Sequence, residues 1–474
     1  MTYPTASQIT DMTNVGLGQI AQILFSKGFS SQFNRTYRDY DNILMSWKQQ
    51  QPTTEREYRY LLMTAMGVNA VQYQNQGVTN VAFPSGDLST TQEVTALMKK
   101  LQVTVEIDRN VWERVKLAQY KYVDNPLAVE VMNKMDAAKR VQARALYGDG
   151  TGVIGVVGGA NISVSGTGIL IPLSTANTVV GGGNTNWFHK GEKIAFCDKD
   201  GAAHLAASAG GNNLAYAVVT STDRKNRYVY ATCYTSAGVL TTATGAGTVV
   251  AGDFIYPVTV LDSSFVGPDR DTSIDYGTVS PVMCGLESLS QDDSRAVFGV
   301  TMAGALGGSR FDCGAAIFDS SAIEEAMNET EQNVGQGKYK YDQLVMPYNA
   351  YSALLEGKEA DRRFNSVEDS VRGGRKFIYQ YGDQALDCVK SYFCPFNRIY
   401  SVPKPASGEM GETGYAVEYR GTEFKDVTAG GQKEFLKHNG TGYTNMLQSF
   451  LECYTVIVAK QPAAIACLHN FLMV

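Results

Sequence analysis

The chain is short of charge, proline and long apolar runs. Only 19% of its 474 residues are Asp, Glu, Lys or Arg, against roughly 25% in ordinary soluble domains. The 41 basic and 47 acidic residues leave a net charge of −6, which excludes binding of nucleic acid by bulk positive charge. No run of about 20 apolar residues occurs, so no membrane-spanning helix is expected. Hydrophobic residues make up 44%, which excludes a disordered chain.

Cysteine is present but follows no metal-binding or disulfide pattern. The eight cysteines are scattered, without a C-x-x-C pair, at positions Cys197, Cys233, Cys284, Cys313, Cys388, Cys394, Cys453 and Cys467. The first residues, Met1 to Ser7, lack the basic and apolar regions of a secretory signal. We therefore predict an intracellular protein whose thiols are reduced and mostly buried.

Residues that could carry catalysis or bind metal are sparse. None of the four histidines (His189, His204, His438 and His469) lies in an H-E-x-x-H motif or beside a cysteine pair. Cys467 and His469 would share one face of a strand, but two ligands do not make a zinc site. The acidic stretches 269–271 and 291–293 lack the spacing of a calcium loop and are predicted to be solvated loops. The sequence therefore predicts no catalytic, cofactor-binding or metal-binding residue, although two distant carboxylates could still meet in a fold.

One glycine motif has the form of a nucleotide-binding signature. Residues Gly150 to Gly155 match G-x-G-x-x-G. That signature needs a strand before it and a helix after it. Here a helical stretch precedes the motif and a β-like segment follows. The motif is therefore interpreted as the exit turn of a helix.

The first third of the chain predicts elongated elements. Residues 1–50 are predicted to form an arm, with a weak helix from Ile9 to about Gly28 and an extended aromatic stretch at 33–40. Residues 51–107 predict a long protruding β-hairpin. Its polar tip lies at 75–89, and a strand with a clean period of two covers 101–107. Residues 108–147 read as helical, with a helix over 126–147 that has Pro126 in its first turn and Gly148 at its end.

The rest of the chain divides by composition. Residues 151–189 contain no Asp, Glu, Lys or Arg. Short alternating runs around 216–219, 228–230 and 254–258 predict a β-rich unit over 153–290. From 291 the pattern is α/β, with helices from 323 and over 351–356 and strands over 344–347 and 399–403. Residues 441–474 predict closing strands.

This order of parts resembles the major capsid proteins of tailed bacteriophages, the Hong Kong 97-like shell fold. The motifs that carry the resemblance are the strand Val103 to Asp108, the helix exit Leu146 to Gly152, the strand and helix from Tyr341 to Tyr351, and the terminal strands Thr455 to Ala466. The resemblance covers roughly 1–150 and 291–474.

The resemblance implies an α+β fold with six parts. They are an N-terminal arm (1–50), an extended loop (51–107), the spine helix of a peripheral domain (108–152), an inserted β-rich domain (153–290), an axial domain with part of the peripheral domain (291–440), and C-terminal peripheral strands (441–474). The minimal fold does not need 153–290, which is why that span is predicted to be an insertion.

The resemblance also implies partners and a location. The chain would assemble with itself as hexamers and pentamers into an icosahedral head that encloses double-stranded DNA without reading its sequence. A portal protein and a separate scaffolding or decoration protein are expected partners, because no long coiled-coil scaffolding segment precedes the arm. No membrane is involved, and the location is the virion, assembled in the host cytoplasm. Lys99 and Lys100 lie low on the hairpin, so a lysine crosslink to a neighbour is not inferred.

Three other functions stay open at this point. An encapsulin-like shell around a cargo enzyme would use the same fold, and an inner-face pocket for a cargo peptide would favour it. A β-rich adhesin or fibre protein would suit the Gly/Thr/Ser-rich middle, but the α/β region after 291 argues against it. An unrecognised hydrolase would be favoured by a pocket with strongly shifted carboxylates.

Overall fold

The structure is a computed structural model that describes twenty-two stretches of the chain. They are residues 48–50, 57–65, 90–108, 126–159, 163–165, 167–175, 183–197, 216–234, 240, 249, 251–258, 275–279, 282–291, 295–301, 307–334, 341–357, 378–381, 384–403, 413–421, 436–438, 443–459 and 462–472. The predicted arm lies outside the described residues except for 48–50, and so do 109–125 and the hairpin tip. No helix in the described stretches is long and apolar enough to span a membrane.

The chain forms two compact units. The first consists of Met1–Asn42, Lys100–Gln142 and Glu418–Tyr454, and the second of Ile43–Lys99, Ala143–Val417 and Thr455–Val474. The long strand β21 (Tyr443–Ala459), which belongs to the first unit up to Tyr454, pairs with β4 (Lys99–Asp108) and, antiparallel, with β20 (Leu436–His438). These strands confirm the predicted strand at 101–107 and much of the predicted terminal strand region.

The long helix α4 (Pro126–Ala145) confirms the predicted helix and its first residue. It ends in a turn, in which the amide of Tyr147 donates to the Arg144 carbonyl (3.1 Å) and that of Gly148 to the Ala145 carbonyl (3.0 Å). Gly150 and Gly152 follow with φ of 84° and 81°, values that glycine adopts without strain. The glycine motif is therefore the helix exit that the sequence predicted, and it continues into strand β5 (Gly155–Val156).

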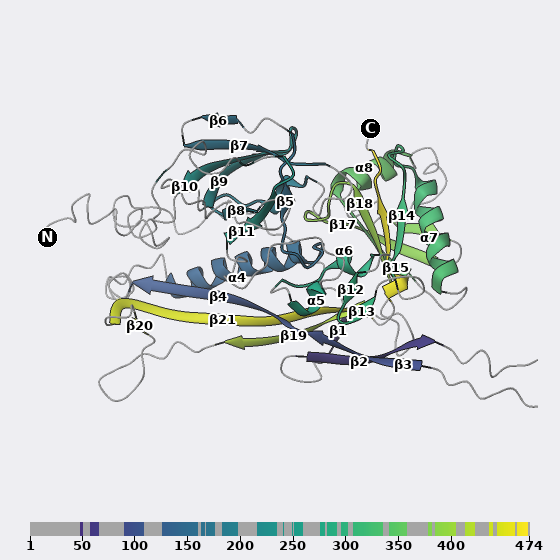
Figure 1. The fold of residues 1–474 in the computed structure, drawn as a ribbon, viewed down its shortest axis with the longest axis horizontal. Coiled ribbons are helices and arrows are strands. Elements are labelled where there is room, and N and C mark those ends of the chain that lie inside the picture. The colour runs from purple at the N-terminus through teal and green to yellow at the C-terminus, as the bar shows by residue number, and fades with distance from the viewer. Residues whose placement is uncertain are drawn as a thin grey trace, which may run out of the picture. The chain divides into compact units, whose positions relative to one another are not determined.

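A six-stranded mixed sheet forms the core of the second unit, with the order β14-β22-β18-β15-β17-β16 (Figure 1). Its strands are β14 (Ser309–Asp312), β22 (Ala466–His469), β18 (Arg398–Pro403), β15 (Tyr341–Met346), β17 (Gln384–Lys390) and β16 (Ile378–Tyr381). Helix α7 (Ser320–Val334) packs on β14 and β22, and α8 (Tyr348–Gly357) follows β15 directly. These elements confirm the α/β prediction for the region after 291.

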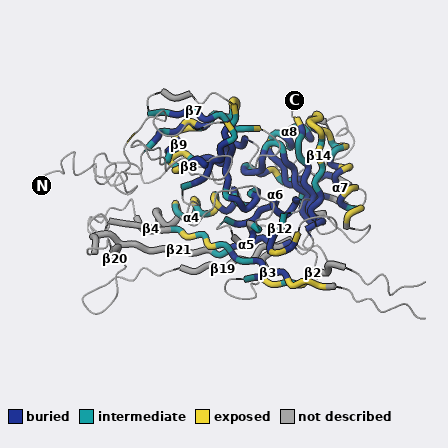
Figure 2. The backbone as a smooth tube through the Cα atoms, viewed as in Figure 1, coloured by how far each residue is buried: buried dark blue, intermediate teal, exposed yellow. Residues whose placement is uncertain are grey.

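The side chains of this sheet and its helices make a continuous apolar core. Leu344, Met346 and Leu386 are fully buried, as are Ile323 and Met327 of α7. The buried residues form a dense cluster over these strands in Figure 2. Burial of this kind is the main stabilising term of a domain.

A second sheet of seven strands confirms the prediction of a β-rich middle region, and every described pairing in it is antiparallel. Its order is β5 (Gly155–Val156), β11 (Phe254–Pro257), β8 (Lys193–Cys197), β9 (Tyr216–Asp223), β10 (Tyr228–Tyr234), β7 (Gly168–Pro172) and β6 (Ser163–Ser165). Along β10, Val229, Ala231 and Cys233 are buried while Tyr230 is exposed, as a sheet covered on one face requires. A single turn of 3-10 helix, η3 (Thr185–Trp187), precedes β8.

Shorter elements complete the second unit. They are β1 (Lys48–Gln50), which pairs in parallel with β19 (Thr413–Gly421), the pair β2 (Glu57–Ala65) and β3 (Thr90–Leu97), the short helices α5 (Tyr276–Val279) and α6 (Leu286–Leu289), the hairpin β12 (Ala296–Val297) and β13 (Val300–Thr301), and η10 (Pro462–Ala464).

The pairing of β2 differs from the sequence prediction. Its partner is β3, from Glu57 opposite Leu97 to Ala65 opposite Thr90, whereas the strand at 101–107 belongs to β4 and pairs with β21. The sequence did not predict β3 because its first half is polar, with Thr91, Gln92 and Glu93. Its buried apolar side chains, Val94 and Ala96, lie in the second half of the strand.

Candidate functional site

The β2–β3 hairpin has one covered face and one open face. Val94 and Ala96 are fully buried on the covered face, opposite Tyr60 and Tyr58. On the open face Leu61 is 74% exposed, opposite the exposed Glu93. The hairpin therefore presents to solvent a face that includes a large aliphatic side chain.

Three hydrogen bonds hold the paired strands β2 and β3, which we call the hairpin root, and Lys99 just after them. The Tyr60 hydroxyl donates to the Ala459 carbonyl at the end of β21 (3.4 Å), and the Gln92 amide donates to the Gly299 carbonyl (3.2 Å). The Lys99 ammonium donates to the Thr278 carbonyl in α5 (3.4 Å), and burial lowers the pKa of Lys99. Each bond reaches a part of the chain far away in sequence, so the hairpin root has a defined position on the second unit.

Asp275 fixes the turn on which the hairpin root rests. Its carboxylate accepts hydrogen bonds from the amides of Phe298 (3.1 Å) and Gly299 (2.6 Å) and from the Thr278 hydroxyl (2.8 Å). Phe298 and Gly299 have φ of 55° and 77°, as in the tight turn of a two-residue hairpin. The carboxylate thereby offsets the strain of a positive φ at a phenylalanine.

In contrast to the exposed hairpin face, the second unit also contains a buried ionic junction around Glu287. The Glu287 carboxylate accepts from Arg310 (2.8 Å), from the Arg398 Nε (3.3 Å) and from the Tyr400 hydroxyl (2.6 Å). Burial raises the pKa of Glu287, but the charges of Arg398 and Arg310 outweigh burial and hold it far below its ordinary value. Glu287 is therefore ionised, and it ties α6 to β14 and β18.

The same segment closes the end of the long helix. The amide of Leu286 donates to the Leu146 carbonyl (2.7 Å), and the Ser288 hydroxyl donates to the Asp149 carbonyl (3.0 Å). A Cβ on Gly285 would lie 2.3 Å from the Leu146 carbonyl oxygen, so only glycine fits there. Helix α4 thus ends on α6, and α6 is held by Glu287.

Hydrogen bonds at η3, just before β8 of the seven-stranded sheet, join this region to the segment between β17 and β18. The Trp187 indole donates to the Phe393 carbonyl (2.6 Å), and the Asn184 amide donates to the Cys394 carbonyl (3.1 Å). Arg144, near the end of α4, donates to the Trp187 carbonyl (2.8 Å) and to Glu192 (2.7 Å). These contacts complete a ring of buried polar contacts that joins the helix end, both sheets and α6.

Strand β22 carries Cys467 and His469, the two candidate ligands of the sequence analysis. Cys467 is buried beside Arg310, and His469 is half-buried at the end of β22 with its pKa lowered to about 4, first by burial and then by Arg310 and Arg398. Within the described stretches no group of three His, Cys, Asp or Glu could hold a metal. Of the acidic stretches, 269–271 and two residues of 291–293 lie outside the description. The seven cysteines whose side chains the structure describes form no disulfide bonds.

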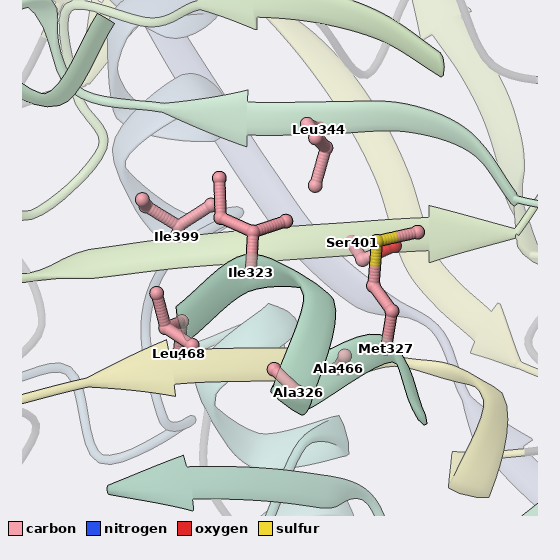
Figure 3. A pocket seen from close by; sticks show the side chains of 8 residues that line it. All are labelled: Ile323, Ala326, Met327, Leu344, Ile399, Ser401, Ala466 and Leu468. Carbon is pink, nitrogen blue, oxygen red and sulfur yellow. The ribbon is translucent and has the colours of Figure 1, made fainter. Parts of the chain in front are cut away.

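One cavity lies between α7 and the six-stranded sheet. Its volume is about 10 Å³, and its lining is aliphatic apart from the sulfur of Met327 and the hydroxyl of Ser401 (Figure 3). The lining residues are Ile323, Ala326, Met327, Leu344, Ile399, Ser401, Ala466 and Leu468. This volume holds at most one water molecule, so the cavity does not accommodate an organic substrate.

Sequence reasoning missed the Glu287 junction entirely. Its members are separated by up to 113 residues and stand in no motif. The nearest signal is Gly285 before Leu286, whose significance appears only when the helix end lies against it.

No protein-family model and no curated protein matches the chain. The chain is similar to the cyanophage A-1(L) capsid asymmetric unit, with 8% identity over 94% of this chain and 97% of that one and a TM-score of 0.49. It is also similar to the capsid of a native GTA particle, with 10% identity, coverage of 95% and 98% and a TM-score of 0.42.

A third similar structure is the holo-SrpI encapsulin complex from Synechococcus elongatus PCC 7942. Its identity is 7%, its TM-score is 0.39, and the match covers 96% of this chain and 95% of that one. These neighbours are capsids and an encapsulin.

Proposed function

We propose that the chain is a shell subunit, and specifically the major capsid protein of a tailed double-stranded DNA bacteriophage. The observation that carries this proposal is the β2–β3 hairpin, which is bonded to the second unit at its root and open on one face. A two-stranded hairpin is marginal in water by itself. Here one face is covered within the chain, and the other, with Leu61, is left for a neighbouring subunit to cover.

The order of elements supports the same proposal. A hairpin, a long helix with a glycine-rich exit, an α/β region and closing C-terminal strands follow one another, as in the shell fold that the sequence resembles. Within this proposal 1–50 is the arm, 51–107 the extended loop, 108–152 the spine helix and 441–474 the closing peripheral strands. Closed assembly needs complementary patches on different sides of one subunit, and a protruding hairpin supplies such a patch without enlarging the core.

The span 153–290 is proposed to be the insertion, and 291–440 the axial domain with part of the peripheral domain. The seven-stranded sheet supports this division, since all its strands lie between 155 and 257. Its bonds from Asn184 and Trp187 to residues 393 and 394 cross the proposed boundary. We therefore expect an insertion that is fixed to the axial domain rather than a loosely tethered module.

The remaining features fit a container for DNA. A net charge of −6 avoids tight binding of phosphate, which would increase with each added Lys or Arg. The proposal places the protein in the virion head, assembled in the host cytoplasm, with portal and scaffolding or decoration proteins as partners and without an enzymatic role or cofactor. The Glu287 carboxylate is bonded to arginines and a tyrosine, which suits a structural ion pair better than a hydrolase pair.

A deletion at the hairpin tip tests this proposal. Removal of residues 76–86 is expected to leave the urea-unfolding midpoint of the subunit unchanged, because the anchoring bonds lie at the root. Closed particles, counted by electron microscopy, should become rare. Replacement of 76–86 by an equally long Gly/Ser segment separates the role of length from that of sequence. Normal shells from the deletion variant would contradict the role assigned to the hairpin.

A further inference from the structure

The carboxyl ends of four strands lie along one end of the six-stranded sheet. Strand β14 is parallel to β22, and β15 is parallel to β17. Because β18 is antiparallel to both β22 and β15, all four strands run in the same direction. The segment after β14, the chain after β22 and the start of α8 therefore share this end of the sheet (Figure 1).

The flank that follows β14 and β22 exposes two aliphatic side chains and two aspartates. Ile317 is 66% exposed and Leu472 is 57% exposed. They lie side by side, because the Leu472 amide donates to the Ala316 carbonyl (2.9 Å) and the Phe318 amide to the Leu472 carbonyl (2.9 Å). Asp312 and Asp319 are exposed on the same stretch of chain. We call Ile317, Leu472, Asp312 and Asp319 the acidic flank.

The other flank is aromatic and basic. Tyr348, the first residue of α8, is 50% exposed. The Lys390 ammonium, at the end of β17, lies 5.5 Å from the ring centroids of both Tyr348 and Tyr351. We call Tyr348, Tyr351 and Lys390 the aromatic flank. Strand β18 separates the two flanks in the sheet order.

We propose that the acidic flank of one copy docks on the aromatic flank of the next copy of this chain. The inference rests on the proposed function, which it deepens by naming the contact between neighbouring subunits. The acidic flank exposes Ile317 and Leu472, and the aromatic flank exposes the Tyr348 ring. The charges of the two flanks are opposite, which favours one register over others. Because the two flanks differ, the contact is head-to-tail, and repetition of a head-to-tail contact closes a ring when the rotation permits.

Disulfide trapping between two variants tests this contact. The variants Ile317→Cys and Tyr348→Cys are purified separately, mixed before assembly, and oxidised with copper phenanthroline after particles have formed. A disulfide-linked dimer in the mixture, well above that in either variant alone, is the expected result. The control is Leu240→Cys mixed with Tyr348→Cys, since Leu240 is 54% exposed but lies beside Tyr234 of the seven-stranded sheet.

The outcomes separate this inference from the proposed function. Particles that form normally but show no more dimer than the Leu240→Cys control would overturn the docking of the two flanks and leave the shell function standing. Absence of particles from the wild-type chain would overturn the shell function itself, and the inference with it. An excess of dimer in the mixture supports both.

Discussion

Two clusters of arginine and glutamate in the second unit have the same chemistry and opposite surroundings. Around Glu287, the side chains of Glu287 and Arg398 are 6% and 2% exposed. On the hairpin, Arg59 binds Glu57 (2.8 Å) and Glu93 (3.5 Å), with 47% of the Arg59 side chain exposed. The first cluster joins segments more than 100 residues apart, whereas the second joins two strands that are already paired.

The difference shows which of the two clusters the fold of one chain depends on. A buried charge without a partner is costly, so the Glu287 cluster must form for the second unit to fold. An exposed pair exchanges its partners for water at little cost. Under the proposed function, the hairpin cluster can therefore exchange its contacts for those of another subunit, whereas the junction cannot.

The largest effect is expected from Glu287→Gln. The substitution leaves Arg310 and Arg398 buried without a counter-charge, which typically destabilises a protein by about 3–5 kcal/mol. The urea-unfolding midpoint of the purified subunit measures this loss. Glu93→Gln on the hairpin is the matched control, because it removes the same charge from an exposed pair. Equal midpoints for the two variants would show that the junction does not hold the fold.

A smaller, pH-dependent effect is expected at His469. Its pKa in the folded chain is lowered to about 4, first by burial and then by Arg310 and Arg398, against about 6.5 in an unfolded chain. Between these values the unfolded chain binds the proton and the folded chain does not. The free energy of unfolding should therefore decrease as the pH falls from about 6.5 to about 4.

The variant His469→Gln should lose this part of the pH dependence. Urea midpoints of the variant and the wild type, compared at pH 7 and pH 4.5, isolate it from the titration of the carboxylates. Identical changes in the two proteins would mean that His469 is protonated as easily in the folded chain as in the unfolded one.

The smallest effect on stability is expected from Arg59→Ala. Glu57 raises the pKa of the Arg59 guanidinium, first through a hydrogen bond and then through its charge. Because this pair is exposed, the unfolding midpoint of the variant should stay within experimental error of the wild type. The yield of closed particles should nevertheless decrease, because Arg59 lies on the open face. A shifted midpoint with a normal particle yield would reverse the comparison between the two clusters.

Most of the helices and strands that were predicted correctly were predicted from hydrophobic periodicity and from residues typical of helix ends. Pro126 at the start of α4, the alternation at 101–107 and the apolar run at 344–346 were sufficient, because each is encoded within a few neighbouring residues. The β-rich middle region was evident from its composition for the same reason.

Features that depend on distant residues could not be predicted in this way. The pairing of β2 with β3 depends on a chain reversal of more than twenty residues, and nothing in the strands excluded β4 as the partner. The Glu287 junction depends on α6, β14 and β18, which are separate segments of the sequence. Trp187 gave no signal that its indole would bind the Phe393 carbonyl.

Electron cryomicroscopy of the purified wild-type chain tests the central claim most directly. The account predicts uniform closed icosahedral particles, in which each β2–β3 hairpin lies on a neighbouring subunit. Particles from infected cells should contain double-stranded DNA, whereas a protein cargo inside them would identify an encapsulin-like shell. A stable monomer that forms no closed particles at any protein concentration would contradict the assignment of this chain as a shell subunit.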